Sequence, residues 1–209
     1  MTPYDEIARL GVATIHEAFG RRGLIDVDLH QIVPGSRAAG PARTVRCGQG
    51  DNLMVHAALS KVQPGEVLVL TMPVPAPISL VGELIAIQAA FRKVAAILVD
   101  GAVRDVEQLA TMDVPIWARW IRAAGATKDS VGTIDEPVLV GGVEISAGDL
   151  VVLDADGAVA VPRSQVETVV EAARVRERSE EQARPRYRAG ALTYDLAGYR
   201  ARVEGGPES

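Results

Sequence analysis

Runs of consecutive apolar residues mark the middle of the chain. Residues 66–72 (EVLVLTM) and 95–101 (AAILVDG) are apolar at nearly every position, and residues 82–93 between them have a helical pattern. A strand that is apolar on both sides is buried on both faces, as in a parallel sheet whose crossovers are helices. The pattern therefore predicts a parallel β-α-β unit in this region.

Further elements are predicted on the N-terminal side of this unit. Pro3 suits the first turn of a helix, and Thr14 to Glu17 form a capping-box pattern for a second short helix that stops at Gly20. Residues 42–47 (ARTVRC) form a predicted strand, and Asp51 is a predicted cap for a helix over residues 52–62. We therefore expect helices and a strand before the β-α-β unit.

After the unit, residues 105–112 form a predicted helix and residues 114–119 a predicted strand. From Glu136 onward the pattern is different: short apolar runs alternate with turn residues, and Asp156-Gly157 is a hairpin signal. The sequence therefore predicts an α/β fold in which antiparallel strands close a mixed sheet or barrel-like core flanked by helices.

The C-terminal part of the chain has the pattern of a long helix. Ser164 to Glu167 form a second capping box, and the helix that follows has an apolar face made by Val166, Val169, Val170 and Ala173. Beyond Arg174 the pattern is charged nearly all round, up to Pro185. Such a segment is either solvated or packed against another subunit.

Composition narrows the class of protein. The chain has 209 residues, of which 48% are hydrophobic and 23% charged, as expected for one globular domain with a terminal extension. The net charge of −5 argues against nucleic-acid or anionic-membrane partners. Cys47 is the single cysteine, so an intrachain disulfide is impossible. With no signal peptide or apolar run long enough to span a bilayer, we expect a cytoplasmic protein.

Polar residues gather where the two parallel strands end. The segment 71–83 leads from the first strand into a helix that starts near Glu83, and Arg104-Asp105 follow the second strand. Ligands in such sheets bind at the carboxyl ends of the strands, and a crossover returns the chain to the same edge. We therefore expect Glu83, Arg104 and Asp105 to lie in one crevice.

These residue types suit a particular chemistry. Arg104 offers a planar fork of donors for a carboxylate or enolate oxygen, whereas Glu83 and Asp105 offer hard oxygens for Mg²⁺ or Mn²⁺. A small 2-oxo acid held through a divalent metal is one interpretation. On residue types alone, a helix cap at Asp105 is the simpler explanation, with Arg104 paired to Glu107 or Asp100 on the surface.

Other candidate residues are less promising. The three histidines show no zinc-binding spacing, and His56 is interpreted as a neutral imidazole in the core or near a substrate. Cys47 is expected to be buried in apolar surroundings. Lys128 could line an anionic site, although an exposed loop lysine is the more common case.

The chain resembles the RraA-like family, and within it the class II pyruvate aldolases. The likeness rests on GDNLMVHAAL, GELIA, VDGAVRDVEQL and GGVEISAGDLVVLDADGAVAVP, and on an acidic residue followed after twenty intervening residues by Arg-Asp. Glu83, Arg104 and Asp105 fit that spacing. The resemblance implies the family's αββα fold of the swivelling β/β/α type, with a catalytic domain over residues 1–163 and a C-terminal helix and tail over residues 164–209.

The resemblance also implies a role for each matching residue. Asp105 would ligate Mg²⁺, Mn²⁺ or another divalent metal, and Arg104 would contact the pyruvyl part of the substrate and its enolate oxygen. Glu83 would hold a metal-bound water. The backbone N–H groups of Leu84 and Ile85 would receive the substrate carboxylate. A glutamate from the C-terminal helix of a neighbouring subunit would complete the water shell: Glu180 is the preferred residue, with Glu177 and Glu181 as alternatives.

The implied reaction is metal-dependent cleavage of 4-carboxy-4-hydroxy-2-oxoadipate or 4-hydroxy-4-methyl-2-oxoglutarate to pyruvate and a second oxo acid, with oxaloacetate decarboxylation as a side activity. The implied assembly is a homotrimer or homohexamer. Two features depart from the family pattern: Glu83 stands where these aldolases often have Asp, and the preceding loop reads MPVPAPISLV. The alternatives are a regulator that binds a ribonuclease, as other family members do, and another 2-oxo acid lyase.

Overall fold

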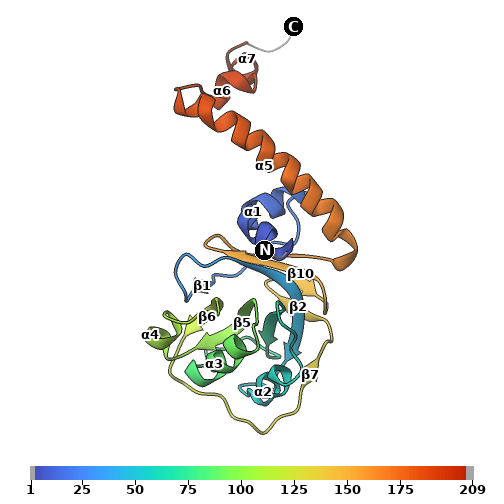
Figure 1. The fold of residues 1–209 in the computed structure, drawn as a ribbon, viewed down its shortest axis with the longest axis vertical. Helices are drawn as coiled ribbons and strands as arrows, with labels where there is room; N and C mark the ends of the chain where they lie inside the picture. Colours follow the sequence, from blue (N-terminus) through green and yellow to red (C-terminus); the bar gives the residue numbers. More distant parts are fainter. Residues whose placement is uncertain (1–2, 206–209) are drawn as a thin grey trace.

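A mixed nine-stranded sheet forms the centre of the computed structural model, which describes residues 3–205 (Figure 1). Its main path runs in the order β1-β6-β5-β3-β2-β10-β11. The strands on this path are β1 (His30–Gln31), β2 (Ala38–Arg46), β3 (Val67–Thr71), β5 (Ala96–Val103), β6 (Ile116–Ile121), β10 (Leu150–Asp154) and β11 (Gly157–Val161). The prediction of a mixed, barrel-like sheet flanked by helices is confirmed.

The parallel half of the sheet matches the predicted β-α-β unit. Strand β3 pairs with β5 in parallel, from Val67 opposite Ala96 onward, and the helix between them is α3 (Glu83–Phe91). Every residue of β3 and β5 is buried. This burial explains the continuous apolar runs, because one face packs under α2 (Leu53–Leu59) and α3 while the other faces the barrel interior.

One strand was absent from the sequence prediction. Within the expected loop 71–83, β4 (Ser79–Val81) pairs in parallel with the end of β5, with Ser79 opposite Ala102. Three prolines precede β4, and proline is typical of loops and strand edges rather than central strands. A segment of three residues carries too little periodicity to be recognised beside them.

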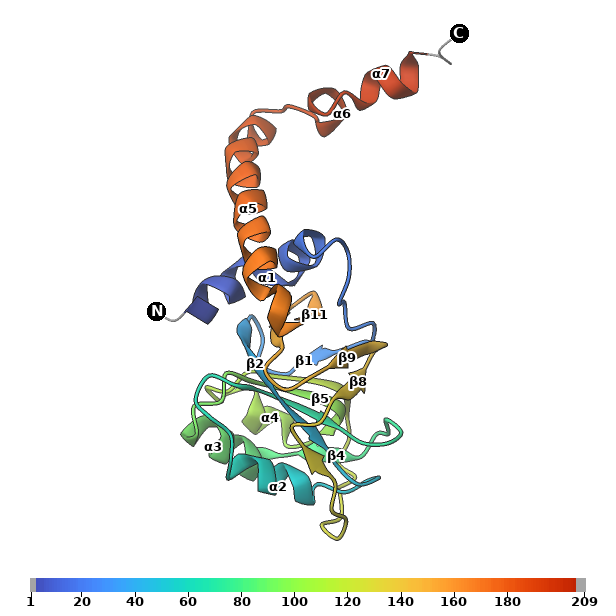
Figure 2. The same cartoon turned by 90° about the vertical axis from the view of Figure 1, so that its right-hand side faces the viewer.

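Strand β2 joins the parallel half to the antiparallel half. Its residues 42–46 pair in parallel with β3, whereas residues 38–41 pair antiparallel with β10. Strands β10 and β11 form the predicted hairpin, but Asp154 stands opposite Gly157, so the turn is Ala155-Asp156 rather than Asp156-Gly157. The short strand β7 (Thr133–Ile134) pairs antiparallel with β2, and β8 (Val138–Val140) and β9 (Val143–Ile145) form a separate antiparallel pair. Figure 2 shows how these strands wrap over the parallel sheet.

Two predicted helix starts are wrong. Helix α1 (Pro3–Ala18) is broken at Gly11 (φ 80°, ψ 168°) and not at Thr14. The buried Asp154 carboxylate causes this break, because its Oδ2 accepts a hydrogen bond of 2.9 Å from the Val12 N–H. A side chain at Gly11 would meet that oxygen. Likewise, Ser164 lies in a short 3₁₀ turn (Arg163–Gln165) and does not cap the helix that follows.

The N-cap of α2 is Asn52, which makes no side-chain capping bond, and the bond expected of a cap comes from Asp51, one residue earlier. Its Oδ1 accepts a hydrogen bond of 2.8 Å from the N–H of Leu53, the first residue of α2. Helix α2 ends at Leu59, which is three residues earlier than predicted. Cys47 is buried as expected, and burial together with the nearby Asp51 charge raises the pKa of its thiol to about 12.

Helix α5 (Val166–Arg188) begins in the domain and then leaves it. Val169, Val170 and Ala173 are buried against α1 and the β10-β11 hairpin, which confirms the predicted apolar face. Arg174 then makes two 2.8 Å hydrogen bonds to Glu6 of α1. The rest of α5 projects away from the sheet and continues into α6 (Thr193–Leu196) and α7 (Tyr199–Glu204) (Figures 1 and 2).

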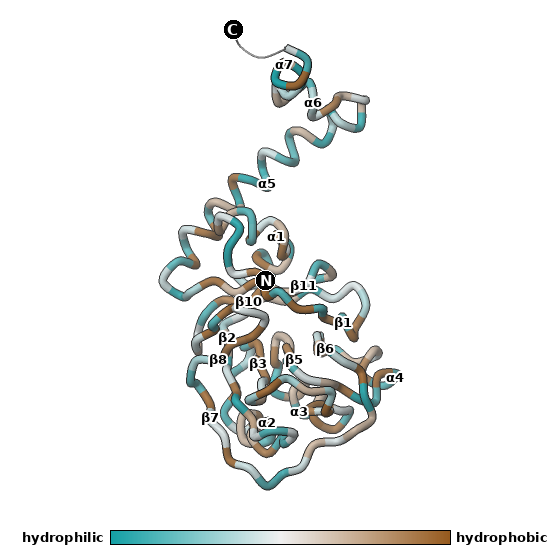
Figure 3. The backbone as a smooth tube through the Cα atoms, turned by 180° about the vertical axis from the view of Figure 1, so that it is seen from behind, coloured by the Kyte–Doolittle hydropathy of each residue, from teal (hydrophilic) through white to brown (hydrophobic). Residues whose placement is uncertain are grey.

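Figure 3 shows that the projecting part of α5 is largely hydrophilic, whereas hydrophobic segments concentrate in the central strands. Only the first turns of α5 pack on the domain. The domain boundary at residue 163 and the contact of the projecting part of α5 with a neighbouring subunit remain predictions. Within residues 3–205, no helix is long and apolar enough to cross a membrane.

Candidate active site

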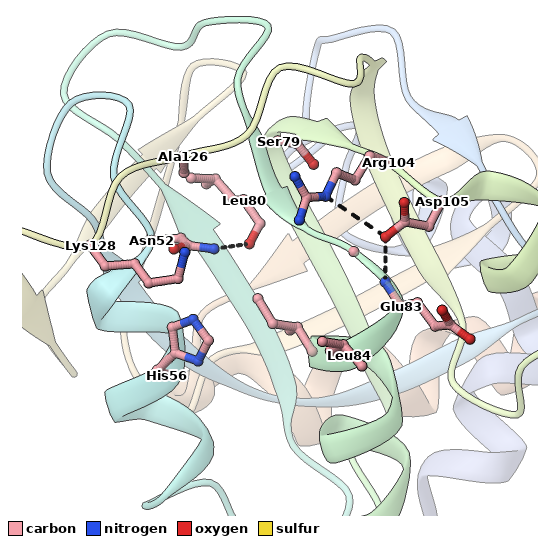
Figure 4. Close-up of a pocket in the computed structure, with 12 residues that line it drawn as sticks. Asn52, His56, Ser79, Leu80, Glu83, Leu84, Arg104, Asp105, Ala126 and Lys128 are labelled. Atoms are coloured by element: carbon pink, nitrogen blue, oxygen red, sulfur yellow. Dashed lines mark hydrogen bonds and ion pairs between the residues drawn. The ribbon is translucent and has the colours of Figure 1, made fainter.

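A pocket of about 430 Å³ opens at the carboxyl end of β5 (Figure 4). It lies between the start of α3, the β5-α4 junction, the start of α2 and a segment near residue 126. The five residues predicted to converge from this half of the chain all line it: Glu83, Leu84, Ile85, Arg104 and Asp105. The other lining residues are Asn52, His56, Ser79, Leu80, Gly82, Ala126 and Lys128.

Asp105 caps a helix, but not the helix that it precedes. It has left-handed backbone angles (φ 59°, ψ 42°), which aspartate tolerates better than most residues, and its side chain makes no capping bond to α4 (Val106–Leu109). Instead, Oδ2 accepts a hydrogen bond of 3.1 Å from the Glu83 N–H at the start of α3. The carboxylate is therefore held at the positive end of the α3 dipole, inside the pocket.

Arg104 does not pair with Glu107 or Asp100, the surface partners considered from the sequence. Its Nε lies 3.7 Å from Asp105 Oδ2, and its side chain is half exposed to the pocket. Asp100 is buried and pairs with Arg119 at 3.0 Å; burial raises the pKa of Asp100, although the Arg119 charge opposes this. Arg104 thus presents its guanidinium to the pocket beside a carboxylate.

The start of α3 provides one free backbone donor. Glu83 N–H is bound to Asp105, and Ile85 N–H donates to the Gly82 carbonyl at 3.1 Å. In the part of the chain that the structure describes, Leu84 N–H has no backbone partner. Figure 4 places the Glu83 carboxylate on the Asp105 side of the pocket. The predicted carboxylate cradle at Leu84 and Ile85 remains a prediction, with Leu84 as its available donor.

The opposite wall carries residues that the sequence did not single out as a group. Lys128 extends toward His56 and Asn52 of the α2 region (Figure 4). Asn52 Nδ2 donates to the Leu80 carbonyl at 3.0 Å, which leaves the buried Oδ1 without a partner. His56 Nε2 is also buried without a partner. Buried polar atoms are rarely unpaired, so these two indicate a place for a ligand or water.

Glu180 lies outside this pocket in its own chain. It pairs with Arg176 at 3.0 Å and lies 3.9 Å from Arg184 on the projecting part of α5. Glu177 and Glu181 line a separate shallow pocket with Glu6 and Arg174. A single chain therefore does not bring these glutamates to Asp105, and their contribution from a neighbouring subunit stays a prediction.

The donor set fits a hard divalent cation better than zinc. No group of three or more His, Cys, Asp or Glu residues that could hold a metal occurs among residues 3–205. Mg²⁺ needs fewer protein ligands, because it is commonly held by one or two carboxylates while waters and substrate oxygens fill the remaining positions. Asp105 and Glu83 fit this type of site.

Gly125 gives a first test of the pocket geometry. A Cβ at this position would stand 2.7 Å from Nη1 of Arg104, so Gly125→Ala should displace the guanidinium without touching Asp105. We expect the rate of the reaction at this site to fall by about 10²-fold, as for misplacement by about 1 Å, with little change in melting temperature. Ala123→Gly is the control, because Ala123 is exposed in the neighbouring chain and does not line the pocket; its rate should match that of the wild type.

Comparisons with known proteins agree with this architecture. Residues 12–160 match the family model described as "RraA-like: Aldolase/RraA". The chain belongs to the RraA-like family. A curated relative from Halalkalibacterium halodurans, named "Putative 4-hydroxy-4-methyl-2-oxoglutarate aldolase", is 34% identical over 168 residues, which cover 80% of this chain and 78% of the relative.

Solved structures of RraA-like proteins share the fold. Streptomyces coelicolor RraAS2, described as an unusual member of the RNase ES inhibitor RraA protein family, has a TM-score of 0.75 and 31% identity. That match covers 88% of this chain and 98% of RraAS2. The RNA-processing inhibitor RraA from Thermus thermophilis has a TM-score of 0.60 and 30% identity, covering 64% of this chain and 81% of its own.

Proposed function

We propose that this RraA-like protein is a divalent-metal-dependent lyase that cleaves a 4-hydroxy-2-oxo acid to pyruvate and a second oxo acid. The observation that carries the proposal is the convergence of Arg104, Asp105 and the start of α3 in one pocket. The name of the H. halodurans relative supports the same reaction class. Oxaloacetate decarboxylation would use the same site, because it also passes through the enolate of pyruvate.

Binding of the pyruvyl part would use the Arg104 side of the pocket. The guanidinium fork suits the oxygen on which negative charge develops when the carbon–carbon bond breaks, and the free Leu84 N–H suits a carboxylate. The Leu84 N–H belongs to the α3 backbone, so it need not reorganise as charge develops. Arg104 would stabilise the transition state more than the bound substrate.

Asp105 would hold the metal directly, and Glu83 would hold it through water. When bound, Mg²⁺ or Mn²⁺ supplies Lewis-acid polarisation of the 2-oxo group. Glu83 would accept the proton of the C4 hydroxyl and return a proton to the methyl group of pyruvate, with Glu180 of a neighbouring subunit as a second proton acceptor. A homotrimer or homohexamer would bring that glutamate into the site.

The far wall favours a substrate with a second carboxylate. Lys128 supplies a cation there, and the unpartnered Asn52 Oδ1 can accept a hydrogen bond from a hydroxyl group. The hydrogen bond from Asn52 Nδ2 to the Leu80 carbonyl fixes the orientation of the amide. A hydroxy-dicarboxylic or hydroxy-tricarboxylic 2-oxo acid would use both the cation and the acceptor.

A substrate panel tests the proposal. Pyruvate release should be measured from 4-hydroxy-4-methyl-2-oxoglutarate, 4-carboxy-4-hydroxy-2-oxoadipate and oxaloacetate, with Mg²⁺, with Mn²⁺ and with EDTA. We expect EDTA to abolish pyruvate release and added metal to restore it. The two carboxylates of Asp105 and Glu83 would hold the cation, but only the cation supplies the Lewis-acid polarisation of the 2-oxo group. Pyruvate release from none of the three substrates, or full release in EDTA, would contradict the proposal.

A regulator that binds a ribonuclease is the second candidate, since the S. coelicolor and T. thermophilis structures are described as an RNase-inhibitor family member and an RNA-processing inhibitor. Retention of Glu83, Arg104 and Asp105 in one pocket favours the enzyme. A purified sample that bound no Mg²⁺ and released no pyruvate, yet captured a ribonuclease, would reverse this order.

A further inference from the structure

A buried carboxylate lies behind the wall of the pocket that carries Lys128. Asp51 is fully buried and does not itself line the pocket. Its Oδ1 binds the Leu53 N–H at the start of α2, and its Oδ2 accepts three hydrogen bonds from residues 127–130. Those donors are the Thr127 hydroxyl at 2.7 Å, the Asp129 N–H at 2.6 Å and the Ser130 N–H at 3.2 Å.

The segment bound by Asp51, residues 124–130, is here called the strap. One end is tied to β4, where Ser79 N–H donates to the Ala124 carbonyl at 2.8 Å, and Gly125 passes close to Arg104. Backbone bonds join Thr127 to Gly50 and Asn52 at 3.0 and 2.9 Å. Lys128 lies between Thr127 and Asp129, the two strap residues that bind Asp51 most closely. The strap thus connects the two cationic walls of the pocket.

Asp51 stays charged although it is buried. Burial on its own would raise the pKa of this carboxyl, but hydrogen bonds from Leu53 N–H, Asp129 N–H and the Thr127 hydroxyl outweigh it and lower the pKa to about 2. Hydrogen bonds to an ionised acceptor are shorter and stronger than neutral ones. A buried carboxylate with four donors is therefore a rigid anchor for the strap.

We propose that Asp51 is a positioning residue, which fixes the strap so that Lys128 faces Arg104 across the pocket. This inference rests on the proposed function, because it assigns Lys128 to the far end of the same substrate. Asp51 would act only by placing Lys128. Asn52 and the strap separate it from the pocket, so it touches no reacting atom. Loss of the anchor should leave Arg104 and Asp105 in place but let Lys128 move.

A double-mutant cycle distinguishes positioning from general stabilisation. In Asp51→Asn, an amide N–H₂ would replace one carboxylate oxygen and face backbone donors, and we expect kcat/KM for the hydroxy-oxo acid to fall by about 10²-fold. Lys128→Met should cause a similar loss. If Asp51 acts through Lys128, the double variant should be no more than about threefold worse than Lys128→Met alone, because coupled sites are not additive.

Asp149→Asn is the matched control. Asp149 is also a buried carboxylate, and it binds the backbone N–H groups of Ser146 and Arg163 at 2.8 and 2.9 Å, but it lies outside the pocket. Its replacement should lower the melting temperature and leave kcat/KM near the wild-type value. Peptide hydrogen exchange should speed up over residues 124–130 in Asp51→Asn and not in Asp149→Asn; this measurement does not depend on activity.

Thr127→Val covers the case in which Asp51→Asn does not fold, because it removes one donor and keeps the carboxylate. We then expect a loss of about three- to tenfold that disappears in the Lys128→Met background. A folded Asp51→Asn with wild-type kcat/KM and wild-type exchange would overturn the positioning role, and so would losses that multiply with Lys128→Met. An inactive wild-type enzyme would instead overturn the proposed function, while the exchange result would still test the anchor.

Discussion

Asp105→Ala should reduce Mg²⁺-dependent pyruvate release by at least about 10²–10³-fold, the size of loss seen when an electrostatic element of an active site is removed. The substitution removes the proposed direct metal ligand and also the acceptor for the Glu83 N–H at the start of α3. The first loss affects the reaction, and the second affects the stability of α3. The measurement is the rate of pyruvate formation at saturating metal, together with the melting temperature.

Asp105→Asn separates these two roles. Its amide oxygen can still accept the Glu83 N–H, so the melting temperature should return toward the wild-type value. The anionic ligand is still missing, so Mg²⁺ binding measured by calorimetry and pyruvate release should remain low. Asp113→Ala is a suitable control, because Asp113 is an exposed aspartate outside the pocket, soon after α4. Near-normal release by Asp105→Asn would refute the metal-ligand role.

Arg104→Lys should lower kcat by about 10²-fold although it keeps the positive charge, because an ammonium cannot reproduce the planar fork of a guanidinium. We expect a larger effect on kcat than on KM, since the enolate charge that Arg104 meets develops only as the bond breaks. The same loss should appear with oxaloacetate, which shares the pyruvyl part. Steady-state kinetics with both substrates measures this.

Arg122→Lys is the control for this change. Arg122 is exposed, directly follows β6 in the sequence and does not line the pocket. Its kinetics should match those of the wild type. If Arg104→Lys changed KM alone, Arg104 would contribute to substrate binding without stabilising the transition state, and the proposed enolate role would be wrong.

Much of the candidate site was accessible to sequence reasoning. Glu83, Arg104 and Asp105 flank a β-α-β crossover whose apolar runs are continuous, and the crossover rule returns both strand ends to one edge of the sheet. Their convergence follows from topology, so no side-chain contact had to be known. The partners of each residue were harder to predict: Asp105 was expected to cap its own helix on local grounds, whereas it caps α3.

The sequence by itself determined the apolar strands of the parallel unit, the buried face of α5 and the position of Arg104-Asp105 at a strand end. Each of these follows from the spacing of apolar residues within one helix or strand. Only the tertiary structure decided the break at Gly11, the strand β4 and the wall formed by Lys128 and Asn52. Each of these depends on a partner far away in the sequence: Asp154 for Gly11, β5 for β4, and Asp51 for the strap. The hydropathy pattern of neighbouring residues cannot indicate such contacts, because they join segments that meet only when the chain folds.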